Sequence, residues 1–483
     1  MNKKRLPKST YPNRYEIELD VDLDNFSYTG AQKVDLNVVE ATNNIVLNSV
    51  GIEVTKAKIQ TTKQDIPLEV NYIEEDEKIV FESQETLSEG VYELYLEFNS
   101  EITNDLKGFY KSSYMSEDGE KKWIATTQFE PTAARSAFPC WDEPEYKAIF
   151  SMTIITDEKY LRVSNEMVVE EEKVENNKLR TKFADSMKMS SYLVAFVIGD
   201  LEATVVGKSK TTDIRIIHRP GFSHQTSYAG TAAIKLLDFF EDYYKIPYPG
   251  TKLDLIAIPD FAMGAMENVG AVTFRENLLL FDKDKATRSE LDRSITVIAH
   301  ELAHMWFGDL VTMKWWDGIW LNEAFASLME VIASYNTYPE FKQWNAMNMS
   351  RTAGFSIDSL ENSRPVEFDV ETPDQAEEMF DVLTYEKGST VLRMFQMFIG
   401  EEAFQNGVEA YLNKFKFENT NSSDLWDALS EASNQPLNKI LPFWIREKGY
   451  PFLQVDCSNN FLTIKQKPFL LKNVDTDKNN IKP

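Results

Sequence analysis

Five residues in the second half of the chain constrain its fold more than any other feature. The motif His300-Glu301-Leu302-Ala303-His304 holds two of only four histidines in 483 residues. On an α-helix, residues four apart lie on one face about 6 Å apart, so both imidazoles can reach one metal ion. The motif therefore predicts a helix that carries a metal site. The alternative is a pair of unconnected histidines on a helix surface.

A third metal ligand is expected from the next predicted helix. Glu323 lies 19 residues beyond His304 (323 − 304), just inside a helix that opens at Trp320. Two antiparallel helices with such a connection could bring Glu323 to the ion, whereas a lone glutamate there could be a favourable contact with the helix dipole. Catalytic zinc usually takes three protein ligands and leaves one position for water. Two imidazoles and a carboxylate suit one Zn²⁺ per chain.

Glu301 is the natural general base for such a centre. It is adjacent to a predicted ligand, close enough to take a proton from water whose pKa the metal lowers. The motif thus indicates metal-assisted hydrolysis of an amide, and it leaves open whether cleavage is internal or terminal.

The hydrophobic pattern divides the chain into a β-rich first part and a mostly helical second part. Up to about residue 200, apolar and polar residues alternate, which predicts a large antiparallel sheet or sandwich. Thr287 and Glu290 fit a capping box for a helix running to about Phe307. Other elements are a strand at 253–258 and helices at 229–244, 321–335, 386–399, 402–415, 423–432 and 437–447.

The last residues return to a β pattern. Two strands are predicted from Tyr450 onward, followed by a polar tail. A pair of strands cannot bury a face by itself. Either these strands pack on the preceding domains, or a further domain is missing.

Charge and cysteine content narrow the class of protein. With 51 Lys and Arg against 77 Asp and Glu, the net charge is −26, which argues against nucleic acid or an anionic membrane as partner. The basic N-terminus is followed by no apolar segment typical of a secretory signal, and no apolar run is long enough to span a bilayer. Only Cys140 and Cys457 are present, so the cytoplasm is the expected location.

Three further motifs carry a family resemblance. They read DFAMGAMENVG at 260–270, QFEPTAARSAFPCWDEP at 128–144 and LTYEKG at 383–388. Together with the histidine motif and the spacing to Glu323, they resemble the aminopeptidase N family of gluzincin metallopeptidases. The resemblance covers residues 10–465 in order.

The resemblance implies a role for each matching residue. His300, His304 and Glu323 bind zinc, Glu301 is the base, and Tyr385 stabilises the oxyanion. The substrate-binding residues are Gln128, Glu130, Met263, Gly264, Ala265, Met266, Glu267 and Asn268. Among these, the two glutamates resemble the anchor for the substrate's α-ammonium, the glycine and alanine backbone aligns the peptide, and Gln128 and Met263 contact its first side chain. An exopeptidase must accept a free ammonium group and reject an amide. Two buried carboxylates make this distinction, because they are left unpaired unless a cation binds between them.

The implied fold class is α+β and multidomain. It comprises a β-rich N-terminal domain (1–200), a thermolysin-like, mostly helical zinc catalytic domain (201–447), and an incomplete β segment with a polar tail (448–483). Full-length relatives continue into further domains, so a fragment, a natural short form and a chain completed by a partner that supplies the C-terminal region are all open.

The leading interpretation is a zinc aminopeptidase acting on peptides with a free N-terminus. A thermolysin-like endopeptidase is disfavoured by Glu130 and Glu267, and an epoxide hydrolase lacks a lipid-facing signal. An alternative from another functional class is a non-catalytic or partner-completed protein that binds peptide N-termini.

Overall fold

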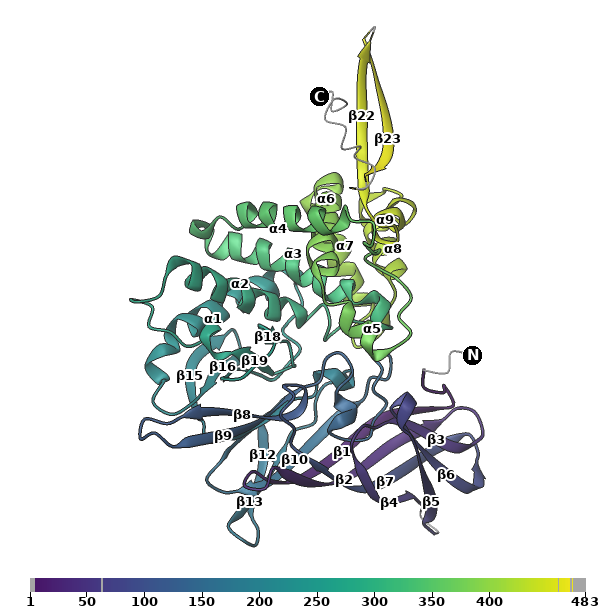
Figure 1. Ribbon diagram of the computed structural model, residues 1–483, viewed down its shortest axis with the longest axis vertical. Helices are drawn as coiled ribbons and strands as arrows, with labels where there is room; N and C mark the ends of the chain where they lie inside the picture. Colours follow the sequence, from purple (N-terminus) through teal and green to yellow (C-terminus); the bar gives the residue numbers. More distant parts are fainter. Residues whose placement is uncertain (1–4, 62–63, 459, 470, 472–483) are drawn as a thin grey trace.

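The computed structural model describes residues 5–61, 64–458, 460–469 and 471. Figure 1 shows strands of the first half at the base, a helical body above them, and a two-stranded hairpin that projects from the top. The polar tail predicted after the last strand falls on residues 472–483 and so lies outside the described residues.

A ten-stranded sheet dominates the first part of the chain. Its order is β12-β13-β10-β1-β2-β7-β4-β5-β6-β3. Its strands are β1 (Thr10–Asp22), β2 (Ser27–Val38), β3 (Thr42–Asn48), β4 (Glu53–Gln60), β5 (Ile66–Ile73), β6 (Lys78–Leu87), β7 (Gly90–Glu101), β10 (Ile149–Asp157), β12 (Val168–Lys173) and β13 (Lys178–Phe183). The predicted antiparallel sheet is confirmed except that β1 and β10 pair in parallel. The alternation of apolar and polar residues along a strand shows which face of the strand is buried. It does not show whether a neighbouring strand runs parallel or antiparallel.

A four-stranded sheet connects this first part to the second part of the chain. It contains β8 (Gly108–Met115), β9 (Lys121–Gln128), β11 (Leu161–Ser164) and β14 (Phe196–Gly199) in the order β11-β14-β9-β8. Asp260 of the second part is held by this sheet: its carboxylate accepts bonds from the Ser112 hydroxyl (3.1 Å) and the Ser113 N–H (2.9 Å), and its carbonyl accepts one from the Tyr110 hydroxyl (3.0 Å). The sheet thereby fixes the start of the segment 260–270.

The second part of the chain begins with a five-stranded sheet that is covered by helices (Figure 1). The order is β15-β16-β17-β19-β18, which places the two-residue strand β18 at the edge. The strands are β15 (Glu202–Ser209), β16 (Thr212–His218), β17 (Lys252–Ile258), β18 (Ala265–Met266) and β19 (Ala271–Arg275). Because β18 is an edge strand, one side of its backbone is free to meet a ligand.

Helices make up most of the remainder. They are α1 (Ser227–Tyr244), α2 (Arg288–His304), α3 (Trp320–Thr337), α4 (Gln343–Asp358), α5 (Pro373–Glu378), α6 (Gly388–Ile399), α7 (Glu401–Lys414), α8 (Ser422–Ser433) and α9 (Leu437–Ile445). A π-helical turn spans Leu383–Lys387, and short 3₁₀ turns span Glu74–Asp76, Ala134–Ser136, Ser191–Leu193, Ser223–Gln225, Glu276–Leu278, Trp316–Gly318 and Pro339–Phe341. Strands β20 (Thr312–Met313) and β21 (Asn419–Thr420) form a small parallel pair.

The predicted helices are confirmed within a few residues, and two were missed. The helix expected to reach Phe307 ends at His304, because the chain turns sharply at Gly308, whose φ of +131° lies in the region that favours glycine. Helices α4 and α5 were not predicted individually, since α4 is rich in Asn, Ser, Thr and Gly and shows little apolar periodicity.

The last two strands form the hairpin β22 (Tyr450–Ser458) and β23 (Phe461–Phe469). Leu453, Val455, Leu462 and Ile464 share one face, and each is more than half exposed. Figure 1 shows the hairpin standing away from the helical body. Of the two alternatives left open by the sequence, packing on the preceding domains does not describe most of the length of this hairpin.

Within the described part of the chain, no helix combines the length and the apolar character needed to cross a bilayer.

Candidate metal centre and substrate pocket

Helix α2 carries the histidine motif and is fixed at both ends. At its start the predicted capping box is present: the Thr287 hydroxyl accepts from the Glu290 N–H at 3.3 Å, and the Glu290 carboxylate accepts from the Thr287 N–H at 2.7 Å. At its end the chain turns back on itself, and the Asp309 N–H donates to the His304 carbonyl at 3.1 Å. The last helical turn, which bears both histidines, is therefore held in place.

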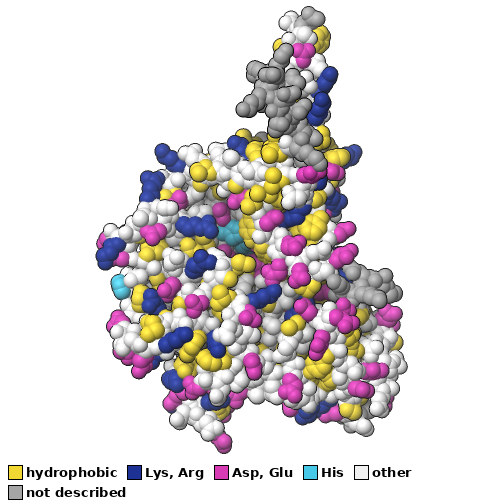
Figure 2. All heavy atoms as spheres, in the orientation of Figure 1, with side chains coloured by type: hydrophobic (Ala, Val, Ile, Leu, Met, Phe, Trp, Pro, Cys, Tyr) yellow, Lys and Arg dark blue, Asp and Glu magenta, His cyan; other side chains and the backbone are white. Residues whose placement is uncertain are grey.

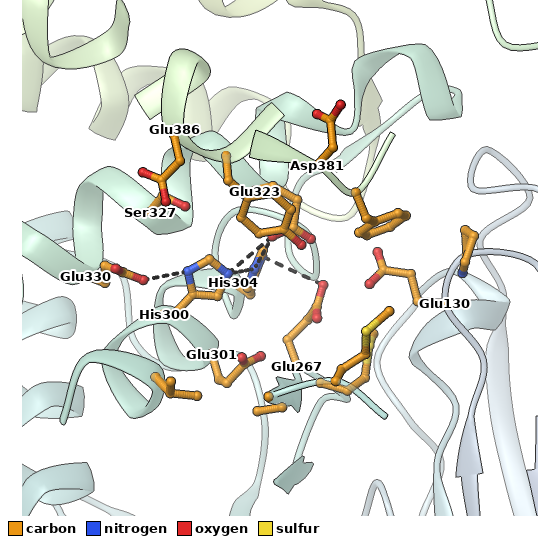
Figure 3. Close-up of a pocket in the computed structure, with 18 of the residues that line it drawn as sticks. Glu130, Glu267, His300, Glu301, His304, Glu323, Ser327, Glu330, Asp381 and Glu386 are labelled. Atoms are coloured by element: carbon orange, nitrogen blue, oxygen red, sulfur yellow. Dashed lines mark hydrogen bonds and ion pairs between the residues drawn. The ribbon is translucent and has the colours of Figure 1, made fainter. Parts of the chain in front are cut away.

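The three predicted metal ligands converge on one point (Figure 3). The Nε2 atoms of His300 and His304 lie 3.1 Å apart, and Glu323 Oε2 lies 3.2 Å from the first and 3.4 Å from the second. Donor atoms about 2.05 Å from a tetrahedral zinc ion are about 3.3 Å apart. The observed separations fit a zinc ion coordinated by these three residues.

Hydrogen bonds on the outer ring nitrogens set the direction of the two histidines. His304 Nδ1 lies 2.9 Å from the Phe307 carbonyl, which can only accept, and His300 Nδ1 lies 2.8 Å from a carboxylate oxygen of Glu330. Both Nδ1 atoms therefore carry the proton, and in the neutral rings both Nε2 lone pairs face each other and Glu323. With both rings neutral, these three acceptors have no donor between them and together suit a cation.

The charge balance of the centre also favours a cation. Burial lowers the pKa of His304, but the nearby Glu267 and Glu323 outweigh this effect and raise it to about 10. Burial raises the pKa of Glu301 to about 8, although His300 and His304 pull it down. A divalent ion at the three ligands would displace protons from the imidazoles and keep positive charge beside Glu301, which favours the ionised form of its carboxyl group.

Two buried carboxylates stand beside the three ligands, and His304 Nδ1 lies 3.7 Å from Oε1 of one of them, Glu267. Glu130 and Glu267 are 7% and 3% exposed, and one oxygen of each has no hydrogen-bond partner among the described residues. Burial raises the pKa of both, and the charge of Glu267 raises that of Glu130 further. Carboxylate oxygens of these two residues and of Glu323 lie within 4.8 Å of one another. A cationic group bound here would relieve the cost of burying both carboxylates.

The segment 263–267 forms one wall of the cavity. Gly264, Ala265 and Met266 lie at or in the edge strand β18, and the Gln128 amide reaches across to Met266 Sδ at 3.4 Å. Met263 is 40% exposed at the rim. This wall offers a free backbone edge and, on its side chains, a soft apolar surface.

Tyr385 reaches the cavity from the π-helical turn, an irregularity that is frequent at functional sites. Its ring lies 6.0 Å from that of His300, centroid to centroid. The Asp381 carboxylate fixes the turn by accepting from the N–H groups of Leu383 (2.8 Å) and Thr384 (3.1 Å). Burial, and then the charge of Glu323, raise the pKa of Tyr385 well above its usual value, so it stays a proton donor.

The cavity has a volume of about 460 Å³ and is lined by twelve of the thirteen predicted site residues. Figure 2 shows the hollow, with histidine visible inside it and acidic side chains nearby. Asn268 is not in the lining: its side chain is buried and donates to Thr273 Oγ1 at 3.2 Å, where it supports the turn between β18 and β19.

Residues absent from the sequence analysis also belong to the site. Glu330 orients His300, and the signal for it was present, because it lies seven residues after Glu323 on the same helix face. Arg293 and Ser327 also line the cavity, and nothing in the local pattern of the sequence marks them.

Comparison with known proteins identifies the family. The description "Peptidase M1 N-terminal domain" matches residues 11–193, and "Peptidase family M1 domain" matches residues 228–444. The chain belongs to peptidase family M1.

Curated relatives of this M1 chain are named as aminopeptidases. Aminopeptidase M1 of Arabidopsis thaliana is 41% identical over 471 residues, covering 96% of this chain and 53% of the relative. Aminopeptidase 2 of Candida albicans is 40% identical over 469 residues, covering 96% and 50%. Puromycin-sensitive aminopeptidase of Caenorhabditis elegans is 38% identical over 483 residues, covering 98% and 51%. The M1 chain thus spans about half the length of the curated relatives it matches.

Proposed function

We propose that this chain is a zinc-dependent aminopeptidase that hydrolyses the first peptide bond of peptides with a free N-terminus. The observation that carries the proposal is the short distance between the two halves of the cavity: Glu130 and Glu267 lie within 4.8 Å of the metal ligand Glu323. In a peptide, the α-nitrogen is only about 2.5 Å from the first carbonyl carbon. An ammonium group held by these two carboxylates places the first peptide bond, and no later one, at the metal.

The proposed roles follow from the positions of the side chains. His300, His304 and Glu323 would hold Zn²⁺, which supplies a water of lowered pKa and polarises the scissile carbonyl. Glu301 removes a proton from the attacking water and returns it to the leaving amine. Tyr385 donates a hydrogen bond to the developing oxyanion, which is negatively charged only in the transition state.

The substrate is proposed to bind as an extra strand on β18. An extended peptide can form backbone hydrogen bonds with the free edge at Gly264 and Ala265. Its first side chain then faces Gln128 and Met263, neither of which is charged, so neutral or apolar first residues are favoured. No nucleic acid or membrane is part of the proposal, and the two free cysteines suit a cytoplasmic location.

The test is hydrolysis of a fluorogenic leucyl amide beside its N-acetyl derivative, with a chelated sample as control. We expect turnover of the free amine alone, lost on chelation and restored by zinc. Equal rates for both substrates would contradict the proposed ammonium anchor and favour an endopeptidase.

A second candidate function is favoured by the hairpin β22–β23. Its exposed apolar face suits contact with another polypeptide segment, because a two-stranded hairpin is marginally stable by itself. In this alternative, the 483 residues bind zinc and peptide N-termini but need a partner segment for turnover. One bound zinc per chain and measurable peptide binding, with no hydrolysis, would support it.

A further inference from the structure

Two buried side chains of the N-terminal domain reach the loop that follows the metal-bearing helix. The loop consists of Gly308, Asp309 and Leu310, directly after the last turn of α2. Tyr192 and Lys147 belong to the segment matched by the N-terminal family description, residues 11–193. Both are almost completely buried, and neither is part of the cavity lining. The proposed mechanism gives them no role.

Tyr192 connects the two helices that carry the predicted ligands. Its hydroxyl donates to the Gly308 carbonyl at 3.2 Å and accepts from the Asn322 amide at 3.2 Å. Gly308 lies four residues after His304, and Asn322 immediately precedes Glu323. One hydroxyl therefore ties the end of α2 to the start of α3.

Lys147 holds the next two carbonyls of the same loop. Its ammonium donates to the carbonyls of Asp309 at 3.1 Å and Leu310 at 3.3 Å. Burying an ammonium group is costly unless it is hydrogen-bonded, so these contacts fix the lysine and the loop together. Three consecutive carbonyls are thus held by donors from the other domain.

The loop has a reason to need this support. Asp309 is fully buried, and both of its carboxylate oxygens lack a hydrogen-bond partner among the residues described. An unpaired buried carboxylate opposes the loop's conformation. The same loop sets the Phe307 carbonyl that orients His304, and a Cβ on Gly308 would stand 3.3 Å from His304 Nδ1. A shift of the loop would therefore move a metal ligand.

We propose that Tyr192 and Lys147 are positioning residues through which the N-terminal domain sets the geometry of the metal centre. The inference rests on the proposed zinc function and extends it, because it makes metal affinity a property of both domains. Removing either donor lets the loop and the orientation of His304 relax, which weakens the metal site without touching a ligand.

The main test is Tyr192→Phe, which removes only the hydroxyl. The matched control is Tyr28→Phe, because Tyr28 is a buried tyrosine of the same domain whose hydroxyl donates to the Ala137 carbonyl at 2.9 Å, outside the cavity lining. Zinc dissociation constants are measured by competition with a chromogenic chelator, and the visible absorption of the cobalt(II)-substituted protein reports ligand geometry.

We expect zinc binding about 10-fold weaker and altered cobalt bands in Tyr192→Phe, with neither change in Tyr28→Phe. Equal dissociation constants and superimposable cobalt spectra for the two variants would overturn the inference. Failure of the unmodified protein to bind zinc would contradict the proposed function instead, so the two failures are distinguishable.

A second pair of variants tests the lysine. Lys147→Met is compared with Lys78→Met, because Lys78 is also a buried lysine of the N-terminal domain and donates to the Arg5 carbonyl at 3.4 Å. We expect both to lower the melting temperature and only Lys147→Met to weaken zinc binding. Should Lys147→Met not fold, the tyrosine pair decides the question alone.

Discussion

The cavity has two acidic halves that differ in how their carboxylates are paired. In the metal half, Glu323 lies beside both imidazoles and Glu330 bonds one of them. In the ammonium half, Glu130 and Glu267 are buried side by side, and each keeps an oxygen without a hydrogen bond. The halves lie a few ångströms apart, yet only one is fully organised by the protein's own side chains.

This difference indicates how the two proposed cations, the metal ion and the ammonium group of the substrate, are expected to bind. A resident ion needs a site whose ligands are held in place, and the bonds from Glu330 and Phe307 provide this. A substrate ammonium must enter and leave at each turnover. Carboxylates whose oxygens are not all bonded by the protein keep acceptors free for such a group, and its positive charge would lower their raised pKa values while it is bound.

The largest effect is expected from removing a ligand of the metal half. His300→Ala should abolish zinc binding and reduce peptide hydrolysis to background, because two ligands do not hold the ion. Zinc per chain is measured by atomic absorption beside turnover of the leucyl amide. Full activity with stoichiometric zinc in this variant would contradict the ligand assignment.

Changing the base between the halves should act on rate alone. Glu301→Gln keeps the shape of the side chain but cannot accept a proton, so we expect kcat to fall about 100-fold to 10,000-fold. Zinc content should stay at one per chain. Loss of zinc together with activity would show that Glu301 supports the metal half rather than the chemistry.

A change in the ammonium half should leave the metal in place and affect recognition. Glu267→Gln is expected to lower kcat/KM for free-amine substrates about 30-fold to 1000-fold, equivalent to roughly 2–4 kcal/mol for a buried charge pair. Because the N-acetyl substrate has no ammonium, its slow background rate should be unchanged. An equal loss of kcat/KM on both substrates would contradict a role for Glu267 in recognising the ammonium group.

The smallest effect is expected from the outer support of the metal half. Glu330→Gln retains an acceptor for His300 but removes its charge, and we expect zinc to bind about 10-fold to 100-fold more weakly with kcat nearly unchanged at saturating zinc. Chelator competition and zinc titration of activity provide the measurement. No change in affinity would mean that the orientation of His300 depends on packing alone.

Local patterns predicted the elements and the ligand set of the site. Thr287 and Glu290 marked the start of α2, and the helical spacing of the two histidines together with Glu323 gave the converging donors. These signals are readable because the interacting residues are close in sequence or lie on one helix face. Among the predicted residues, Asn268 departed from its expected contact, since membership of a motif does not say which way a side chain points.

Contacts between distant segments could not be read in the same way. Tyr192 and Gly308 are 116 residues apart, and Lys147 and Asp309 are 162 apart. Each pair joins a side chain to a backbone carbonyl. Because every residue has a backbone carbonyl, the sequence does not show which one will accept such a bond. The parallel pairing of β1 with β10 was hidden for a similar reason, because strand direction depends on the path of the intervening chain.

The bonds from Tyr110, Ser112 and Ser113 to Asp260 have a consequence for how the protein responds to heat. They join the four-stranded sheet to the start of the segment that lines the cavity, so we expect the two parts to unfold together. Calorimetry should then record one endotherm for both domains, and activity should vanish along that same transition. The boundary near residue 200 separates two patterns in the sequence, and a single endotherm would show that it does not separate two independently unfolding units.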